Sequence, residues 1–265
     1  MQSIFSRAKD CISCCDPAEK CNLTHQLAND WNNQWVIIDD GDVVAPITEP
    51  GRPEKPHLVS PKNVARRRVH TDSGRIILAH ALAHIEFNAI NLALDAIYRF
   101  RDMPVDYYSD WLKVADEEAY HFRLLEKYLM DRGSEYGEYD AHNGLWEMAV
   151  KTADDVLSRM ALVPRVLEAR GLDVTPGLIE KLTAAGDDDF AERLRIIHRD
   201  EIGHVAIGSR WFHYLCDQRG LDSRETFTKL LDEYMVGPLK GPFDDVTRIQ
   251  AGFTEMELAD LREKQ

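Results

Sequence analysis

The sequence Glu-Ala-Tyr-His at residues 118–121 has a counterpart in Glu-Ile-Gly-His at residues 201–204. Residues three apart on an α-helix lie about 60° apart around its axis and roughly one turn apart along it, so both side chains reach one point. A carboxylate and an imidazole from one helix can therefore bind the same metal ion. A third Glu-x-x-His match, at residues 54–57, is set aside because Pro56 prevents the helical geometry.

A single glutamate precedes each motif at a similar distance. Glu86 lies 32 residues before Glu118, and Glu168 lies 33 residues before Glu201. This order predicts two helical hairpins that present similar sets of ligands. The six predicted metal ligands are Glu86, Glu118, His121, Glu168, Glu201 and His204.

The charges of this set favour two metal ions. Four carboxylates in a dry core would repel one another, at a cost of several kcal/mol for each unpaired ion, whereas two divalent cations would neutralise them. Oxygen-rich ligation with two imidazoles suits iron or manganese better than a thiolate-seeking metal. The residues around Glu86 and Glu201 at helical spacing are small or apolar, which predicts that both glutamates face the core.

Hydrophobic periodicity from residue 72 onward predicts long helices without intervening strands. We expect four of them, at Asp72–Arg101, Asp106–Arg132, Asn143–Arg170 and Asp187–Gly220, with Gly133 and Gly171 after the second and third. A short helix is expected to begin at Thr175 and Pro176. The predicted fold class is all-α, with a four-helix bundle at its centre.

The flanking segments complete a three-part organisation. Residues 1–71 are predicted to form an N-terminal helix, with Asp16-Pro17 as a helix start, and a proline-rich arm packed on the bundle, because five prolines lie between residues 46 and 61. Residues 72–220 form the dimetal bundle, and residues 221–265 are a C-terminal helical extension. In that extension, residues 254–257 match a capping box.

Two residues near the predicted ligands are candidates for orienting them. His198 lies three residues before Glu201, and Arg165 lies three residues before Glu168 and could pair with a ligand carboxylate. Pro164 should kink its helix near Glu168. The pattern assigns no catalytic residue.

Composition limits the other function classes. The net charge of −14 disfavours nucleic-acid binding, although it does not exclude it. The N-terminus has no apolar run typical of a signal peptide, and six polar residues in the longest apolar stretch, 76–96, argue against a membrane span. An odd number of cysteines, five, argues against a disulfide scaffold. We expect a soluble, cytoplasmic protein without a membrane partner.

The ligand pattern resembles that of the ferritin-like di-iron carboxylate superfamily. More closely, the segments HALAHIEFNAINLALDAIYRF, EEAYHFRLL, RMALVPRVLEARGLDVTPG and RDEIGHVAIGSRWF resemble an uncharacterised bacterial family of ferritin-like proteins, over most of residues 15–260. The phrase VLEARG, followed later by Glu-x-x-His, is distantly similar to the di-iron tRNA hydroxylases. The superfamily implies six metal-binding residues, and all six positions are filled.

The expected function is that of a dimetal carboxylate protein, with iron as the favoured metal and a manganese–iron or other divalent pair as alternatives. An oxidase or hydroxylase that activates O2 is the first hypothesis, with an unknown substrate and electron donor. A metal-handling ferroxidase or peroxide scavenger and a structural metal-binding bundle without catalysis stay open. A homodimer is compatible with the sequence.

Overall fold

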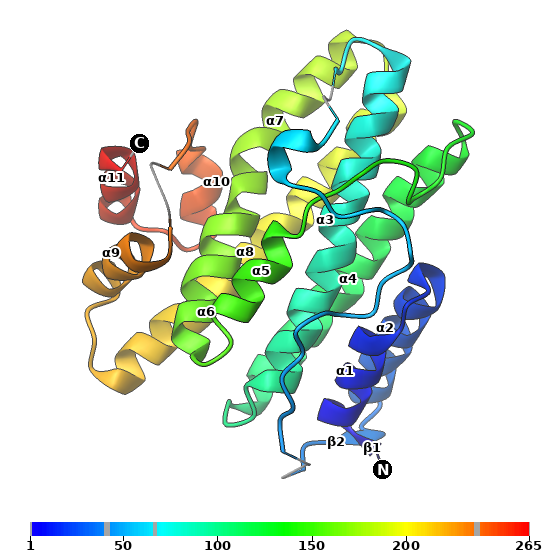
Figure 1. The fold of residues 1–265 in the computed structure, drawn as a ribbon. Helices are drawn as coiled ribbons and strands as arrows, with labels where there is room; N and C mark the ends of the chain where they lie inside the picture. Colours follow the sequence, from blue (N-terminus) through cyan, green and yellow to red (C-terminus); the bar gives the residue numbers. More distant parts are fainter. Residues whose placement is uncertain (1, 40–42, 66–67, 236–238, 265) are drawn as a thin grey trace. The chain divides into compact units, whose positions relative to one another are not determined.

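The computed structural model describes residues 2–39, 43–65, 68–235 and 239–264. Its regular structure is almost entirely helical, which confirms the predicted all-α class. Contacts divide the chain into two compact units, Met1–Val150 and Lys151–Gln265, and each is described by itself (Figure 1). The division at residues 71 and 220 stays a prediction.

The first unit is built on a pair of long helices. They are α3 (Asp72–Arg99) and α4 (Val105–Met130), which pack against each other and end within two residues of the predicted positions. Helix α3 begins where the Thr71 side chain accepts a hydrogen bond from the Gly74 backbone, and α4 is followed by Gly133 with φ 70°.

Helix α3 is the core helix of this unit. Every residue from Asn88 to Tyr98 is buried. Its length and composition would suffice to cross a membrane, but 78% of its most apolar window is buried within the protein, as in the core helix of a soluble protein.

Two shorter helices cover the pair. Helix α1 (Ile4–Ser13) packs on α3, and α2 (Pro17–Asn32) packs on α4. Strand β1 (Gln2–Ser3) pairs in parallel with β2 (Val36–Ile37). The predicted start at Asp16-Pro17 is confirmed, because the Asp16 carboxylate accepts a hydrogen bond from the Glu19 backbone at 2.8 Å.

Lys20 on α2 joins three of these helices. Its ammonium donates to the backbone carbonyls of Cys11 and Ile12 at 3.0 and 2.7 Å, at the end of α1, and to Oδ1 of Asn91 on α3 at 2.6 Å. Burial lowers the pKa of Lys20 to about 8. The ammonium is thereby one of the donors that satisfy the last carbonyls of α1.

The proline-rich segment has no α-helix between Val43 and Ala65, where a 3₁₀ turn at Pro61–Asn63 is the one helical element described. Its backbone is held against the unit by hydrogen bonds at a few points and by a bridge between Leu58 and Ala141. Gly51 donates to the Ile12 carbonyl at 2.8 Å, and Val59 donates to the Ala141 carbonyl at 2.8 Å. Helix α5 (Gly144–Lys151) follows Ala141 and ends at the boundary of the unit.

The second unit begins with an interrupted helix. Helix α6 (Val156–Leu162) continues as a π-helical segment, η2 (Val163–Glu168), and then as α7 (Ala169–Ala184). The expected helix over Asn143–Arg170 starts close to the predicted residue but is interrupted between α5 and α6, and the predicted stop at Gly171 is wrong. Asp155 starts a new helix by accepting from two backbone N–H groups, and the chain stays helical through Gly171 and Pro176.

Helix α8 (Asp188–Arg219) packs on α6, η2 and α7. Its predicted bounds are confirmed, because the Asp187 side chain accepts from the Phe190 backbone and Gly220 has φ 63°. Three helices follow, α9 (Ser223–Tyr234), α10 (Asp245–Gln250) and α11 (Glu255–Glu263). The capping box of Thr254 and Glu257 at the start of α11 is also confirmed.

Candidate metal site

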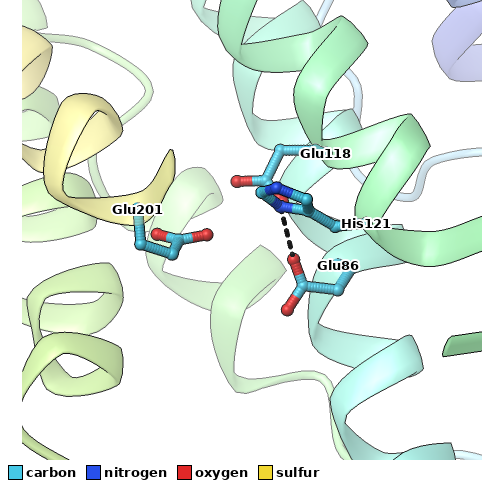
Figure 2. A group of neighbouring side chains, drawn as sticks. All are labelled: Glu86, Glu118, His121 and Glu201. Carbon is cyan, nitrogen blue, oxygen red and sulfur yellow. Dashed lines mark ion pairs between the residues drawn. The ribbon is translucent and has the colours of Figure 1, made fainter. Parts of the chain in front are cut away.

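Helices α3 and α4 bring three predicted ligands together in the first unit. Nδ1 of His121 lies 3.4 Å from Oε2 of Glu86 and 3.5 Å from Oε2 of Glu118. One ligand atom from each residue lies within 4.8 Å of the others, and all three residues are buried. Figure 2 draws these side chains, with the ion pair of His121 and Glu86 as a dashed line, together with Glu201 of the second unit.

The electrostatics of this cluster suit a cation. Burial alone would lower the pKa of His121, but the carboxylates of Glu118 and Glu86 outweigh it and hold that pKa well above its usual value. A protonated His121 would offset one of the two buried carboxylate charges, and a divalent cation would offset both. Two carboxylates and one imidazole are also a donor set that iron, manganese and zinc accept, so this cluster could hold a metal ion.

The second unit repeats part of this geometry on α8. Nδ1 of His204 lies 3.5 Å from Oε1 of Glu201, the same separation as in the pair of His121 and Glu118. His204 is fully buried, and the Glu201 side chain is 13% exposed. Both Glu-x-x-His motifs thus lie within long helices, with their two side chains directed to one point, as the spacing predicts.

Glu168 has a different setting. It is the last residue of η2 and is half-buried. The close group of the first unit contains three of the six predicted ligands, and the α8 pair contains two more. The kink expected from Pro164 takes the form of the π-helical segment, because proline lacks the N–H that an α-helical hydrogen bond needs.

Both candidate orienting residues, Arg165 and His198, lie in the second unit. Arg165 donates from Nη2 to Oε1 of Glu257 at 2.6 Å, so its observed carboxylate partner is a residue of α11 and not a predicted ligand. His198 is half-buried on α8, where burial lowers its pKa.

Glu257 of the second unit has a role that the sequence did not predict. Glu257 was expected only as the partner of Thr254 in a capping box, yet it also balances the buried charge of Arg165, 92 residues away. A local pattern carries no signal for such a distant ion pair.

The two histidines that precede Glu86 behave as hydrogen-bonded core residues, because His84 contacts the Tyr136 hydroxyl at 2.8 Å and His80 accepts from the Gly137 backbone at 2.9 Å.

The fold and the site define a class: a mainly helical protein with a buried glutamate and histidine cluster able to hold a metal ion. The chain belongs to the family described as protein of unknown function (DUF455), whose model matches residues 13–259. A protein of Haemophilus influenzae (strain ATCC 51907 / DSM 11121 / KW20 / Rd), described as uncharacterized, is 46% identical over 264 residues, with 96% of this chain and 92% of that protein covered. The search of solved structures found no match.

Proposed function

We propose that this chain is a ferritin-like dimetal carboxylate protein that activates O2 as an oxidase or hydroxylase. In this proposal, the pair α3–α4 and the pair formed by α6–η2–α7 with α8 assemble into one four-helix bundle. The six predicted ligands then surround two metal ions, with iron favoured over a manganese–iron or other pair. The observation that carries the proposal is the buried trio of Glu86, Glu118 and His121, whose Glu-x-x-His geometry is repeated by Glu201 and His204.

Burial is the physical reason for assigning metal to these residues. Glu86 is 5% exposed, and Glu118 and His121 are fully buried. Ionised carboxylates are rarely left in such a place unless a cation or a strong hydrogen-bond network compensates for their lost hydration. Iron also fits the donor chemistry, because its ions accept carboxylate oxygen and imidazole nitrogen together.

The protein's part in the reaction would be to hold and isolate the metals. Bound iron would supply the redox chemistry towards O2. Glu118 and His121 would bind from α4, Glu201 and His204 from α8, and Glu86 and Glu168 would complete the ligand set. The apolar core helix α3 would keep bulk water from the site, as Asn88–Tyr98 are all buried.

The test is anaerobic loading of the purified chain with Fe(II), followed by elemental analysis and exposure to air. We expect two irons per chain and a new near-UV or visible absorption after exposure to air. Glu118→Ala should lose most of the iron. The control is Glu117→Ala, because Glu117 is adjacent on α4 but lies towards the surface, with Lys113 at 3.8 Å.

Three outcomes separate the alternatives. A chain that binds no iron, or a Glu118→Ala variant that binds as much as the wild type, would refute the site. Iron without an air-dependent spectral change would refute O2 activation and leave a structural metal. Iron oxidation in a large assembly, seen by light scattering, would favour metal handling over substrate oxidation.

A further inference from the structure

The C-terminal residues 241–257 contact the chain on both sides of Glu168. We propose that the segment 239–264 is a brace that positions this predicted ligand, and that it acts through Arg165 on η2 and through its own Arg248. This inference rests on the proposed function, because it assigns to the C-terminal extension the task of placing one metal ligand.

The brace is needed because Glu168 lies at the end of a π-helical segment. A π-helix is rare and has poorer intrinsic stability than an α-helix, so tertiary contacts must hold it. A π-helical turn contains more residues than an α-helical turn, so it rotates the side chains that follow it around the helix axis. The direction of Glu168 therefore depends on whatever keeps residues 163–168 in this conformation.

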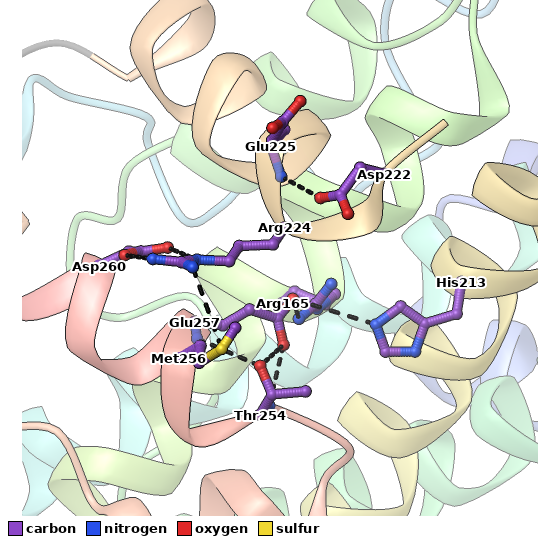
Figure 3. Close-up of polar contacts among 9 residues, drawn as sticks. All are labelled: Arg165, His213, Asp222, Arg224, Glu225, Thr254, Met256, Glu257 and Asp260. Atoms are coloured by element: carbon purple, nitrogen blue, oxygen red, sulfur yellow. Dashed lines mark hydrogen bonds and ion pairs between the residues drawn. The ribbon is translucent and has the colours of Figure 1, made fainter. Parts of the chain in front are cut away.

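Arg165 provides the contact before Glu168. Its guanidinium is fully buried and stacks on the rings of Phe212, Phe227 and Phe253, with distances of 4.4–4.6 Å from the guanidinium carbon to the ring centres. Its one ion-pair partner among the described residues is Glu257, at 2.6 Å (Figure 3). Among the described residues, Nε and Nη1 of Arg165 have no hydrogen-bond partner. The positive charge of Arg165 is therefore stabilised by Glu257 and by the three aromatic rings.

Glu257 is fixed in turn by the capping box of α11. Its Oε2 accepts from the Thr254 backbone at 2.9 Å, while its Oε1 accepts from Arg165. Burial would raise the pKa of Glu257, but the contact with His213 and the charge of Arg165 outweigh it and lower that pKa to about 2. The carboxylate therefore stays ionised near neutral pH, and it links the first turn of α11 to η2.

Arg248 provides the contacts after Glu168. It makes a bidentate ion pair with Asp173 on α7, in which both hydrogen bonds are 2.8 Å long. It also donates to the carbonyl of Ala169 at 3.4 Å. Both side chains are buried, and Phe253 lies 5.0 Å from this guanidinium as well. The Phe253 ring thus contacts both arginines.

A third contact comes from Arg170, which donates to the carbonyls of Pro242 and Gly241 at 2.9 and 3.2 Å. Four positions around Glu168, at 165, 169, 170 and 173, are therefore held by one short C-terminal stretch. Buried two-pronged ion pairs fix direction as well as distance. This geometry suits the positioning of a neighbouring ligand better than general stabilisation of the helix.

The test uses the full chain and Co(II), whose visible absorption reports the geometry of its ligands. The variant Glu257→Gln keeps the shape of the side chain and removes the charge opposite Arg165. We expect wild type to bind two cobalt ions, and Glu257→Gln to bind the weaker one about 10- to 100-fold less tightly, with an altered visible spectrum.

The matched control is Asp260→Asn. Asp260 also lies on α11 and makes a two-pronged ion pair, at 2.6 and 2.7 Å, but with Arg224 of α9 at the surface (Figure 3). It should bind cobalt as the wild type does. Asp173→Asn breaks the contact with Arg248 independently, and it should shift the spectrum even where Glu257→Gln lowers the helix content measured by circular dichroism.

The outcomes distinguish this inference from the proposed function. A wild-type chain that binds no cobalt would refute the metal site itself. Two cobalt ions in the wild type, with the same affinity and spectrum in Glu257→Gln and Asp173→Asn, would refute the brace alone. A loss in Asp260→Asn as large as that in Glu257→Gln would also refute it, because any disturbance of α11 would then suffice.

Discussion

Two glycines on α8 offer a matched test of how η2 is held. At Gly208, one turn after His204, an added Cβ would overlap Cβ and Cγ of Pro164 far inside van der Waals contact. At Gly203, on the same helix, an added Cβ would meet nothing within 4 Å among the described residues. Gly208 therefore lets Pro164 and the π-helical segment approach α8 closely, whereas Gly203 has no such task.

The two alanine variants should change the free energy of unfolding in opposite directions. Replacing glycine by alanine within a helix stabilises it by up to about 1 kcal/mol, so Gly203→Ala should raise the free energy of unfolding by roughly that amount. Gly208→Ala has the same helical gain but forces Pro164 to move, and overpacking of this kind costs about 1–3 kcal/mol. Relative to Gly203→Ala, it should be less stable by about 1–3 kcal/mol.

Urea unfolding followed by far-UV circular dichroism measures this difference, and thermal unfolding should show the same order of stability. A difference of 1 kcal/mol corresponds to a shift in Tm of about 2–4 °C for a chain of this size. Equal stability of the two variants would refute the reasoning. It would mean that η2 can retreat from α8 at no cost, and that the packing of Pro164 on Gly208 does not hold the segment.

Three further features of the structure can be tested by stability measurements. Folding lowers the pKa of Lys20 from 10.5 to about 8, so between pH 8 and 9 the unfolded chain keeps a proton that the folded chain releases. Over this range the unfolding free energy of the wild type should therefore rise by about 1 kcal/mol relative to that of Lys20→Met. A difference in urea titrations that stays constant with pH would contradict this. Asp187→Ala removes the N-cap of α8 and should lower the unfolding free energy by about 1 kcal/mol; unchanged urea unfolding would argue against the bond to the Phe190 backbone. Removal of bound metal by a chelator should lower Tm, because a metal present at 100 times its Kd adds about 2.7 kcal/mol to the free energy of unfolding. Equal Tm values for the metal-loaded and metal-stripped chains would count against a site that forms only in the folded protein.

Local signals in the sequence were sufficient to predict the long helices α3, α4 and α8. Helices α3 and α8 begin at side-chain caps, Thr71 and Asp187, and α8 ends at a glycine with positive φ. Each of these features is read within a few residues. The Glu-x-x-His geometry could be predicted for the same reason, since the spacing on one helix determines which side chains share a face.

The interrupted helix and the pairing of Arg165 could not be predicted in this way. Gly171 and Pro176 normally end a helix, but here α7 continues through both, and its buried Asp173 is bound by Arg248 of a helix far along the chain. The partner of Arg165 lies 92 residues away. Tertiary packing decided both outcomes, and a single sequence holds no measure of it.

The hydrogen bonds of Lys20 have a consequence for its reactivity. All three N–H bonds of the ammonium point to acceptors inside the first unit, so a pKa near 8 does not make this amine available to reagents in solution. An acylating reagent could reach it only when α1 and α2 separate from α3. The rate at which Lys20 becomes labelled would therefore report how often this corner of the protein opens, long before the whole chain unfolds.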